Sequence, residues 1–231
     1  MKILIYSGVF CQNEENRETV KLWGRLTAHL NPDIDIMVFD SCSPFNPDYF
    51  LPNRIHIHHF TDNPGHLSQG GRDGAGRTFC AGIEYAHEQG YDYAIHLESD
   101  MLLARPLRAL IEKMAAAGVK AAACFIPQYQ FFEYGICAMH IPTMVEKKFF
   151  DRYDWENSPK WPIPERRLGE LLGDDLFIIP WFGARNDQHQ IHPHTLAQAF
   201  PYSPADFLTH CSLELAMAFL EMNQITLPEE E

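Results

Sequence analysis

The chain has 231 residues, enough for one substantial hydrophobic core or at most two small ones. Its 31 acidic and 18 basic residues give a formal net charge of −13, which disfavours non-specific binding to nucleic acid or to an anionic membrane. An anionic ligand would therefore need a local positive group: a metal ion, an arginine or a helix N-terminus.

The N-terminal apolar run, MKILIYSGVF, is too short for the core of a signal peptide followed by a cleavage site. No other apolar run reaches the length of a transmembrane helix. The six cysteines form no CxxC pair and lie mostly in apolar stretches, which indicates buried, reduced thiols. We expect a cytoplasmic protein with no transmembrane segment.

Apolar strand-like segments alternate with helical segments along the chain. In order, we predict a strand at 2–7, a helix at 14–32, strands at 33–40 and 54–60, a helix from the glycine-rich turn 65–77 to about Gln89, a strand at 91–98, a helix whose first turn holds Pro106, strands at 119–127, 134–142 and 176–183, and a helix at 204–223. Residues 143–175 show no regular pattern. This β-α-β order predicts an α/β fold with a mainly parallel sheet, in a single domain.

Two carboxylates, Glu98 and Asp100, end the strand predicted at 91–98, in the sequence YDYAIHLESDMLL. Residues i and i+2 of a strand point to the same side, so this pair is expected to project together while Ser99 faces away. Carboxylate oxygens suit Mg²⁺ or Mn²⁺, and open α/β sheets bind ligands at the carboxyl ends of their strands. The alternative is a solvated acidic turn or a helix cap, although Pro106 puts the next helix several residues downstream.

The segment before this pair, GRDGAGRTFCAGIEYAHEQG, contains a glycine turn, an arginine at a helix start and a Gly-Ile pair. Together with the strand and the Glu98-Ser99-Asp100 motif, it resembles the nucleotide-sugar site of GT-A fold glycosyltransferases, which carry a DxD-type motif there. The resemblance implies that Arg77 faces the donor pyrophosphate and that Asp100 binds the metal. Glu98 replaces the usual first Asp, and it could bind the metal directly, bind it through water, or touch the ribose.

The same resemblance, which is closest over 1–105, implies a nucleotide-sugar-binding half at 1–105 and an acceptor-binding half at 106–231. It implies that Asp40, at the end of the second predicted strand, contacts the nucleoside; the alternative is that its side chain caps or closes a turn. Ser7 and Gly8, at the end of the first strand, let the backbone approach the base or ribose; the alternative there is a plain loop.

A histidine late in the chain is implied as a third metal ligand. We favour His210, because it lies after the last strand-like segment and before the terminal helix. His189, His192 and His194 are the other candidates, either as a separate metal site or as a solvated loop. His56, His58 and His59 are interpreted as ordinary polar positions of a strand.

The segment 152–175 is expected to carry the acceptor site. Trp155 and Trp161 are expected to stack on sugar faces, or else to close the core beneath a loop. Glu165, at a predicted helix start, is the candidate general base of an inverting enzyme, and Asp174 and Asp175 are the alternatives.

These features predict a metal-dependent glycosyltransferase of the hexosyltransferase type, which uses Mn²⁺ or Mg²⁺. Its partners would be a nucleoside-diphosphate sugar donor and a glycan, lipid-linked or protein acceptor, with no nucleic acid. The alternatives are a sugar-1-phosphate nucleotidylyltransferase, a non-catalytic nucleotide-sugar or carbohydrate-binding protein, and a histidine-based metal hydrolase. The first needs a basic glycine-rich loop after the first strand, where this chain has the acidic SGVFCQNEEN.

Overall fold

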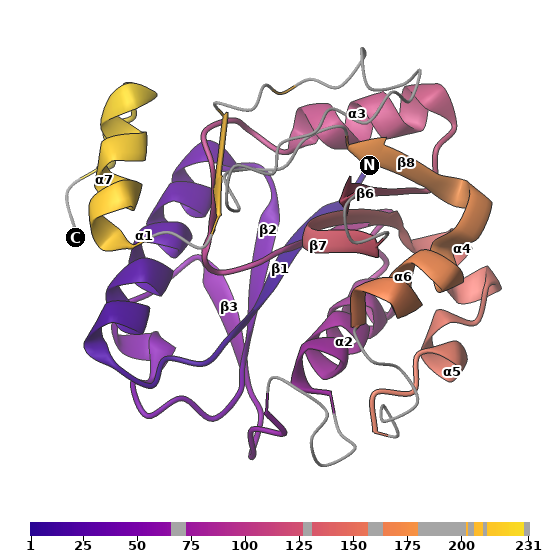
Figure 1. The fold of residues 1–231 in the computed structure, drawn as a ribbon, viewed down its shortest axis with the longest axis horizontal. Coiled ribbons are helices and arrows are strands. Elements are labelled where there is room, and N and C mark those ends of the chain that lie inside the picture. Colours follow the sequence, from indigo (N-terminus) through magenta and orange to yellow (C-terminus); the bar gives the residue numbers. More distant parts are fainter. Residues whose placement is uncertain are drawn as a thin grey trace.

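The computed structural model describes residues 1–65, 73–126, 131–156, 164–179, 202, 206–209 and 212–228 (Figure 1). The main sheet contains β1 (Ile3–Val9), β2 (Asp35–Asp40), β3 (Ile55–His59), β4 (Tyr93–Leu97), β6 (Ala121–Ile126), β7 (Phe131–His140) and β8 (Leu176–Ile179), and a small second sheet contains β5 (Met101–Leu103) and β9 (Phe207–Thr209). The helices are α1 (Glu14–Leu30), α2 (Gly74–Glu88), α3 (Arg108–Ala117), α4 (Ile141–Glu146), α5 (Phe149–Arg152), α6 (Pro164–Leu172) and α7 (Leu213–Met222), with short 3₁₀ turns at Pro47–Tyr49 and Gly173–Asp175.

The main sheet has the strand order β3-β2-β1-β4-β7-β6-β8. All of these strands run in one direction except β7, which pairs antiparallel with both β4 and β6. The predicted α/β fold with a mainly parallel sheet is therefore confirmed. The chain leaves β1 toward β2 on one side, while β4 lies on the other side of β1. Such a reversal of strand order opens a crevice at the carboxyl ends of the strands.

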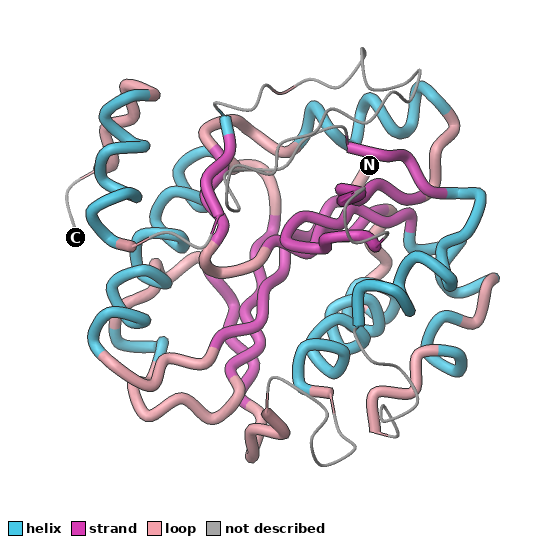
Figure 2. The backbone as a smooth tube through the Cα atoms, viewed as in Figure 1, coloured by secondary structure: helices cyan, strands magenta, loops and turns pink. Residues whose placement is uncertain are grey.

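Helices cover both faces of the main sheet, so the strands form the central layer (Figure 2). One core cluster joins the sheet to α1, α3 and α7, and it contains buried side chains such as Trp23, Leu110 and Phe219. The other joins the sheet to α2, α4, α5 and α6 around Phe79, Phe149 and Leu168. Strands buried on both faces are continuously apolar, which explains why the sequence showed apolar runs with little alternation.

Helix α1 has clear start and stop signals. The side chain of Asn13 accepts a hydrogen bond from the Asn16 N–H at 2.8 Å, and the helix ends at Leu30, before Asn31 and Pro32. Its buried face includes Val20 and Trp23. Among the described residues, neither α1 nor any other helix is both long and apolar enough to cross a bilayer.

Helix α2 packs closely on β1 because glycine stands where a larger residue would collide. A Cβ at Gly82 would lie 2.2 Å from the ring of Tyr6. The Gly-Ile pair noted in the sequence, Gly82 and Ile83, therefore serves helix-to-sheet packing, with Ile83 fully buried.

Several local expectations were wrong. Residues 98–100 form a turn rather than the end of an extended strand, because β4 ends at Leu97 and β5 begins at Met101. The stretch 207–209 is a strand rather than part of the last helix, which begins only at Leu213. The described residues of the segment 143–175 include most of α4 and all of α5 and α6. Pro106 lies two residues before α3, outside its first turn.

Candidate functional site at the carboxyl edge of the sheet

Parallel strands bring most of the predicted site residues to one edge of the sheet. β1 ends beside β2, with Val9 opposite Asp40, and β4 lies on the other side of β1. The hydroxyl of Ser99, in the turn after β4, donates a hydrogen bond of 3.2 Å to the Gly8 carbonyl at the end of β1. The structure therefore places Glu98, Ser99 and Asp100 beside the carboxyl end of β1, and their binding of a ligand stays a prediction.

The geometry of this turn corrects one expectation. The Glu98 N–H donates to the Gly135 carbonyl at 2.8 Å, and the Met101 N–H donates to the Glu98 carbonyl at 3.0 Å. Because the backbone turns here, the alternation of a strand does not apply. Ser99 does not face away from the site but lines a pocket together with Asp100.

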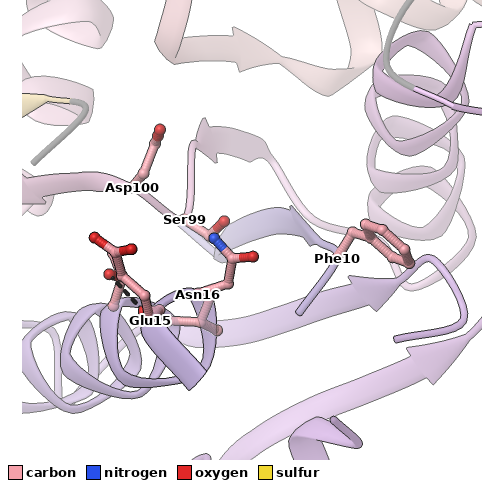
Figure 3. Close-up of a pocket in the computed structure, with 7 residues that line it drawn as sticks. Phe10, Glu15, Asn16, Ser99 and Asp100 are labelled. Carbon is pink, nitrogen blue, oxygen red and sulfur yellow. Dashed lines mark hydrogen bonds between the residues drawn. The ribbon is translucent and has the colours of Figure 1, made fainter. Parts of the chain in front are cut away.

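That pocket has a volume of about 350 Å³ and lies between the turn and the first two turns of α1 (Figure 3). Its wall combines polar side chains with two apolar ones: Glu15, Asn16, Thr19, Ser99 and Asp100, with Phe10 and Val20. Figure 3 shows Glu15 and Asp100 on the same side of the pocket, and the Asn16 amide directed toward Ser99. Glu15, Asn16 and Phe10 were not predicted as site residues. The only sequence signal for them is that they follow β1 at its carboxyl end.

The register of the small sheet brings the C-terminal part of the chain to the same turn. Thr209 of β9 is paired with Met101, the residue after Asp100. The Arg105 side chain also forms an ion pair with Asp206 at 2.9 Å. His210, the favoured third metal ligand, follows Thr209 directly in the sequence but lies outside the described residues.

The donor set of the turn is compatible with a hard divalent cation. Mg²⁺ sites typically use one or two carboxylates, with water and substrate phosphates at the other positions. Glu98 and Asp100 supply two partly exposed carboxylates at the crevice, and Glu15 adds a third at the pocket. Within the part of the chain that the structure describes, no three His, Cys, Asp or Glu side chains are arranged to hold a metal by themselves. A bound metal would thus depend on groups from the ligand or from outside these residues.

Arg77, predicted to face the pyrophosphate, is buried in the second turn of α2. Its guanidinium donates to the Asp62 carboxylate at 2.7 Å and to the Asp62 carbonyl at 2.9 Å, and it stacks on the Phe60 ring at 3.8 Å. Only 7% of its side chain is exposed. In this arrangement Arg77 fastens the segment after β3 to α2, and its role toward phosphate stays a prediction.

The start of α2 is joined to the segment that follows α5. The Asp73 side chain caps the helix by accepting from the Gly76 N–H at 3.0 Å, and it also accepts from the Tyr153 hydroxyl at 3.0 Å. The Asp73 N–H donates to the Trp155 carbonyl at 2.8 Å. Trp155 is partly buried against the core on this face. The structure thus puts Trp155 at the carboxyl edge, and its stacking on a sugar stays a prediction.

Asp40 is buried and already engaged by protein groups. Its carboxylate accepts from the Ser43 N–H at 3.2 Å and bonds His59 Nδ1 at 2.9 Å, while His59 Nε2 lies 3.1 Å from Asp48. The hydrogen bond to Asp40 is the main reason that the pKa of His59 is raised above its usual value, despite some desolvation. His59 was interpreted as an ordinary strand position. The missed signal was its place at the end of β3, directly beside the end of β2.

Ser7 and Gly8 lie at the end of β1 as predicted, where Ser7 is fully buried and Gly8 is partly buried. A Cβ at Gly8 would lie 2.8 Å from the Thr78 side chain, so this glycine makes room for α2. The predicted contact of these two residues with a nucleoside stays a prediction.

The candidates of the acceptor half are only partly described. Glu165 lies in the first turn of α6, as expected for a residue at a helix start. Asp175 pairs with Lys147 and immediately precedes β8, whose first residue is aligned with Ala121 at the start of β6. Asp175 therefore lies at the opposite edge of the sheet from Asp100. Trp161 and the histidines at 189, 192 and 194 lie outside the described residues, as does the side chain of Asp174.

Known structures share this architecture over nearly the whole chain. The galactosyltransferase LgtC, in complex with donor and acceptor sugar analogs, superposes with a TM-score of 0.61 at 14% identity, covering 99% of this chain and 98% of that one. An active-site mutant of LgtC gives 0.62 at 15% identity, with the same coverage. A glycosyltransferase involved in the glycosylation of the major capsid of PBCV-1 gives 0.53 at 12% identity, covering 97% of this chain and all of that one. No family model and no curated protein sequence matches. The chain therefore has the GT-A fold.

Proposed function

We propose that the protein is a glycosyltransferase that moves a sugar from a nucleoside-diphosphate sugar to an acceptor hydroxyl. The observation that carries this proposal is the turn Glu98-Ser99-Asp100, which stands beside a pocket at the crevice of a GT-A sheet. Solved proteins that share this fold include glycosyltransferases, one of them with donor and acceptor sugar analogs.

In the proposed site, Asp100, Glu98 and His210 would hold Mn²⁺ or Mg²⁺ together with the donor diphosphate. The metal would supply Lewis-acid stabilisation of the negative charge on the departing diphosphate. Ser99 holds the turn against β1 through the Gly8 carbonyl, which keeps the carboxylates in place. This rigid attachment fits a catalytic group that must stay close to its productive geometry.

The protein's side chains would then orient the two substrates. Ser7, Gly8 and Asp40 would border the nucleoside at the ends of β1 and β2, and Arg77 would contribute positive potential at the start of α2. The acceptor oxygen attacks the anomeric carbon as the bond to the diphosphate breaks. Glu165 would accept the acceptor proton in an inverting reaction, with Trp155 and Trp161 contacting the acceptor sugar.

The chemistry of the first loop separates this proposal from nucleotidyl transfer. The chain after β1 enters a helix whose first turn carries Glu14 and Glu15, so this loop offers no cationic side chain to a triphosphate. Nucleotide-sugar turnover is consequently the activity to test first.

The test is a panel of nucleoside-diphosphate sugars, each measured for slow hydrolysis and for thermal stabilisation of the protein with Mn²⁺ and with chelator. We expect one donor both to be hydrolysed and to raise the Tm, and only with metal. A donor that raises the Tm without being hydrolysed would favour a binding protein. If no donor does either, the proposed function is wrong.

A further inference from the structure

We propose that the pocket between α1 and the turn 98–100 is the subsite for a neutral, hydroxyl-bearing sugar ring, which Glu15 and Asn16 bind through its hydroxyl groups. This inference rests on the proposed function, since it names the chemical group that enters the site beside Asp100.

Two polar side chains of this pocket are available to a ligand. Among the described residues, neither the Glu15 carboxylate nor the Asn16 side-chain amide hydrogen-bonds or ion-pairs with another side chain. The neighbouring charges on α1 are used differently: Arg17 ion-pairs with Glu14 and Glu18, both at 2.7 Å. A carboxylate accepts hydrogen bonds from hydroxyl groups, and an amide can both donate and accept, so the pair matches the bonding capacity of a sugar.

Two further polar side chains of the pocket, those of Thr19 and Ser99, are already hydrogen-bonded to backbone carbonyl groups. The Thr19 hydroxyl donates to the Glu15 carbonyl at 2.9 Å, and the Ser99 hydroxyl donates to the Gly8 carbonyl at 3.2 Å. These bonds fix the first turns of α1 and the turn 98–100, so the walls are held by backbone contacts. A wall fixed in this way loses little freedom when a ligand binds.

An aromatic ring completes the match to a sugar. Phe10, which follows β1, lines the pocket and is 39% exposed, so a ligand can cover part of its ring. Val20 adds a second apolar surface. One face of a pyranose ring carries mainly C–H groups, which can cover such a ring, while its hydroxyl groups reach the polar side chains. Apolar walls with a few oriented polar groups are the usual composition of small-ligand sites.

Charge decides between a neutral ring and an anionic group. Glu15 presents a carboxylate to the pocket that forms no ion pair with another described side chain, so a phosphate or a uronate there would face repulsion. A neutral ring avoids this cost, and its position beside Asp100 would put it next to the diphosphate site of the proposed function. Such a neutral, hydroxyl-bearing ring could be the sugar of the donor or the sugar of the acceptor.

The test uses ligand-observed NMR titrations of neutral methyl glycosides (gluco, galacto, manno, xylo and N-acetylglucosamine) and of the matching uronates. The proteins are the parent, Glu15→Gln, Phe10→Ala and the control Glu14→Gln. Glu14 is adjacent and of the same type, but it pairs with Arg17 and does not line the pocket. We expect at least one neutral glycoside to bind, more tightly than its uronate.

Glu15→Gln should weaken that glycoside about tenfold, because a charge-assisted hydrogen bond is lost, while Glu14→Gln leaves it unchanged. Glu15→Gln should also reduce the ratio of the affinity for the neutral glycoside to that for the uronate, an effect that misfolding alone would not produce. Phe10→Ala should weaken glycoside and uronate alike. The proposal is overturned if no neutral glycoside binds, or if Glu15→Gln and Glu14→Gln behave the same.

Kinetics with a nucleotide sugar then separate the two sources of the ring. If Glu15→Gln raises the KM for the acceptor alone, the ring belongs to the acceptor; if it raises the KM of donor hydrolysis, the ring belongs to the donor. Glycoside binding that depends on Glu15 in a protein that turns over no donor would keep the subsite and reject the transferase. Donor turnover without such binding would keep the transferase and reject the subsite.

Discussion

The two sides of the crevice use their charged groups differently. On the side of α2, Arg77 is paired with Asp62 and stacked on Phe60, and Asp73 is buried between the Gly76 N–H and the Tyr153 hydroxyl. On the side of α1, Glu98 and Asp100 are partly exposed and Glu15 is exposed.

This difference teaches that charge at a strand edge has two separable uses. Buried and hydrogen-bonded, as at Asp73, it holds loops and helix ends together. Exposed beside a pocket, as at Glu15, it can bind a ligand. Substitutions on the α2 side should therefore act mainly on stability, and those on the α1 side mainly on activity.

The largest effect is expected for Asp73→Ala, on the α2 side. The substitution removes the cap of α2 and leaves the buried Tyr153 hydroxyl without its acceptor, so the free energy of unfolding should fall by about 2–4 kcal/mol. Urea denaturation measures it. Asp73→Asn keeps an acceptor oxygen and should recover most of the loss. If both variants are as stable as the parent, the α2 side is not held together by this carboxylate.

Asp100→Asn tests the α1 side. The proposed function assigns this carboxylate to ligand binding, so the Tm should stay close to that of the parent. Donor turnover should fall at least about tenfold, which corresponds to ~1.4 kcal/mol of lost transition-state stabilisation. Steady-state hydrolysis of the donor measures it. A folded variant with parental turnover would remove the distinction between the two sides.

Arg77→Ala sharpens the comparison, because sequence and structure assign this residue differently. The loss of stacking and of an ion pair with the half-exposed Asp62 should lower the free energy of unfolding by about 1–2 kcal/mol. Calorimetry of a nucleoside and of its diphosphate decides the role. Equal weakening of both ligands means that Arg77 organises the loop, whereas a loss confined to the diphosphate means that it also meets phosphate.

The smallest effect is expected from the pH dependence at His59. Hydrogen bonding to Asp40 raises the pKa of His59 in the folded protein, so this contact stabilises the fold fully below the ordinary histidine pKa of about 6.5. The contribution is lost as the pH rises through the raised folded-state pKa. Since His59 is 41% exposed, we expect well under about 1 kcal/mol.

His59→Gln should abolish this pH-dependent part of the stability, as measured by urea midpoints on either side of the titration. Asp48→Asn should reduce it, because one of the two carboxylates that favour the charged imidazole is removed. An unchanged pH dependence in His59→Gln would assign the effect to another group.

Much of the fold followed from the sequence, because long periodic segments determine their own structure. Helix α1 has a cap, an apolar face and an Asn-Pro stop, and it was predicted to within two residues at its end. Strands β2 and β4 are short, mostly apolar runs, which are typical of buried strands, and all of their residues except Asp35 are buried. The antiparallel direction of β7 was not predicted, since direction depends on pairing partners rather than on local pattern.

The candidate site was predictable in its position but not in its details. The carboxylate motif located Asp100 at the strand edge, since it immediately follows an apolar run. The turn at 98–100 was missed because three residues are too few to show a period. The ion pair between Arg77 and Asp62 was not predicted, because it depends on tertiary contacts. Glu15 and Phe10 could be recognised as pocket residues only from the position of α1 against the turn.

The pairing of β5 with β9 has a consequence for how the protein reaches its folded state. Arg105 and Asp206, which bond beside this small sheet, are 101 residues apart in sequence, so closing that loop costs more entropy than forming the local β-α-β units. The early strands and helices can assemble before β9 has been synthesised. The segment that leads from Asp100 gains its β-partner from this late part of the chain, so we expect β1, β2 and β3 to pair before the turn 98–100 is held by β9.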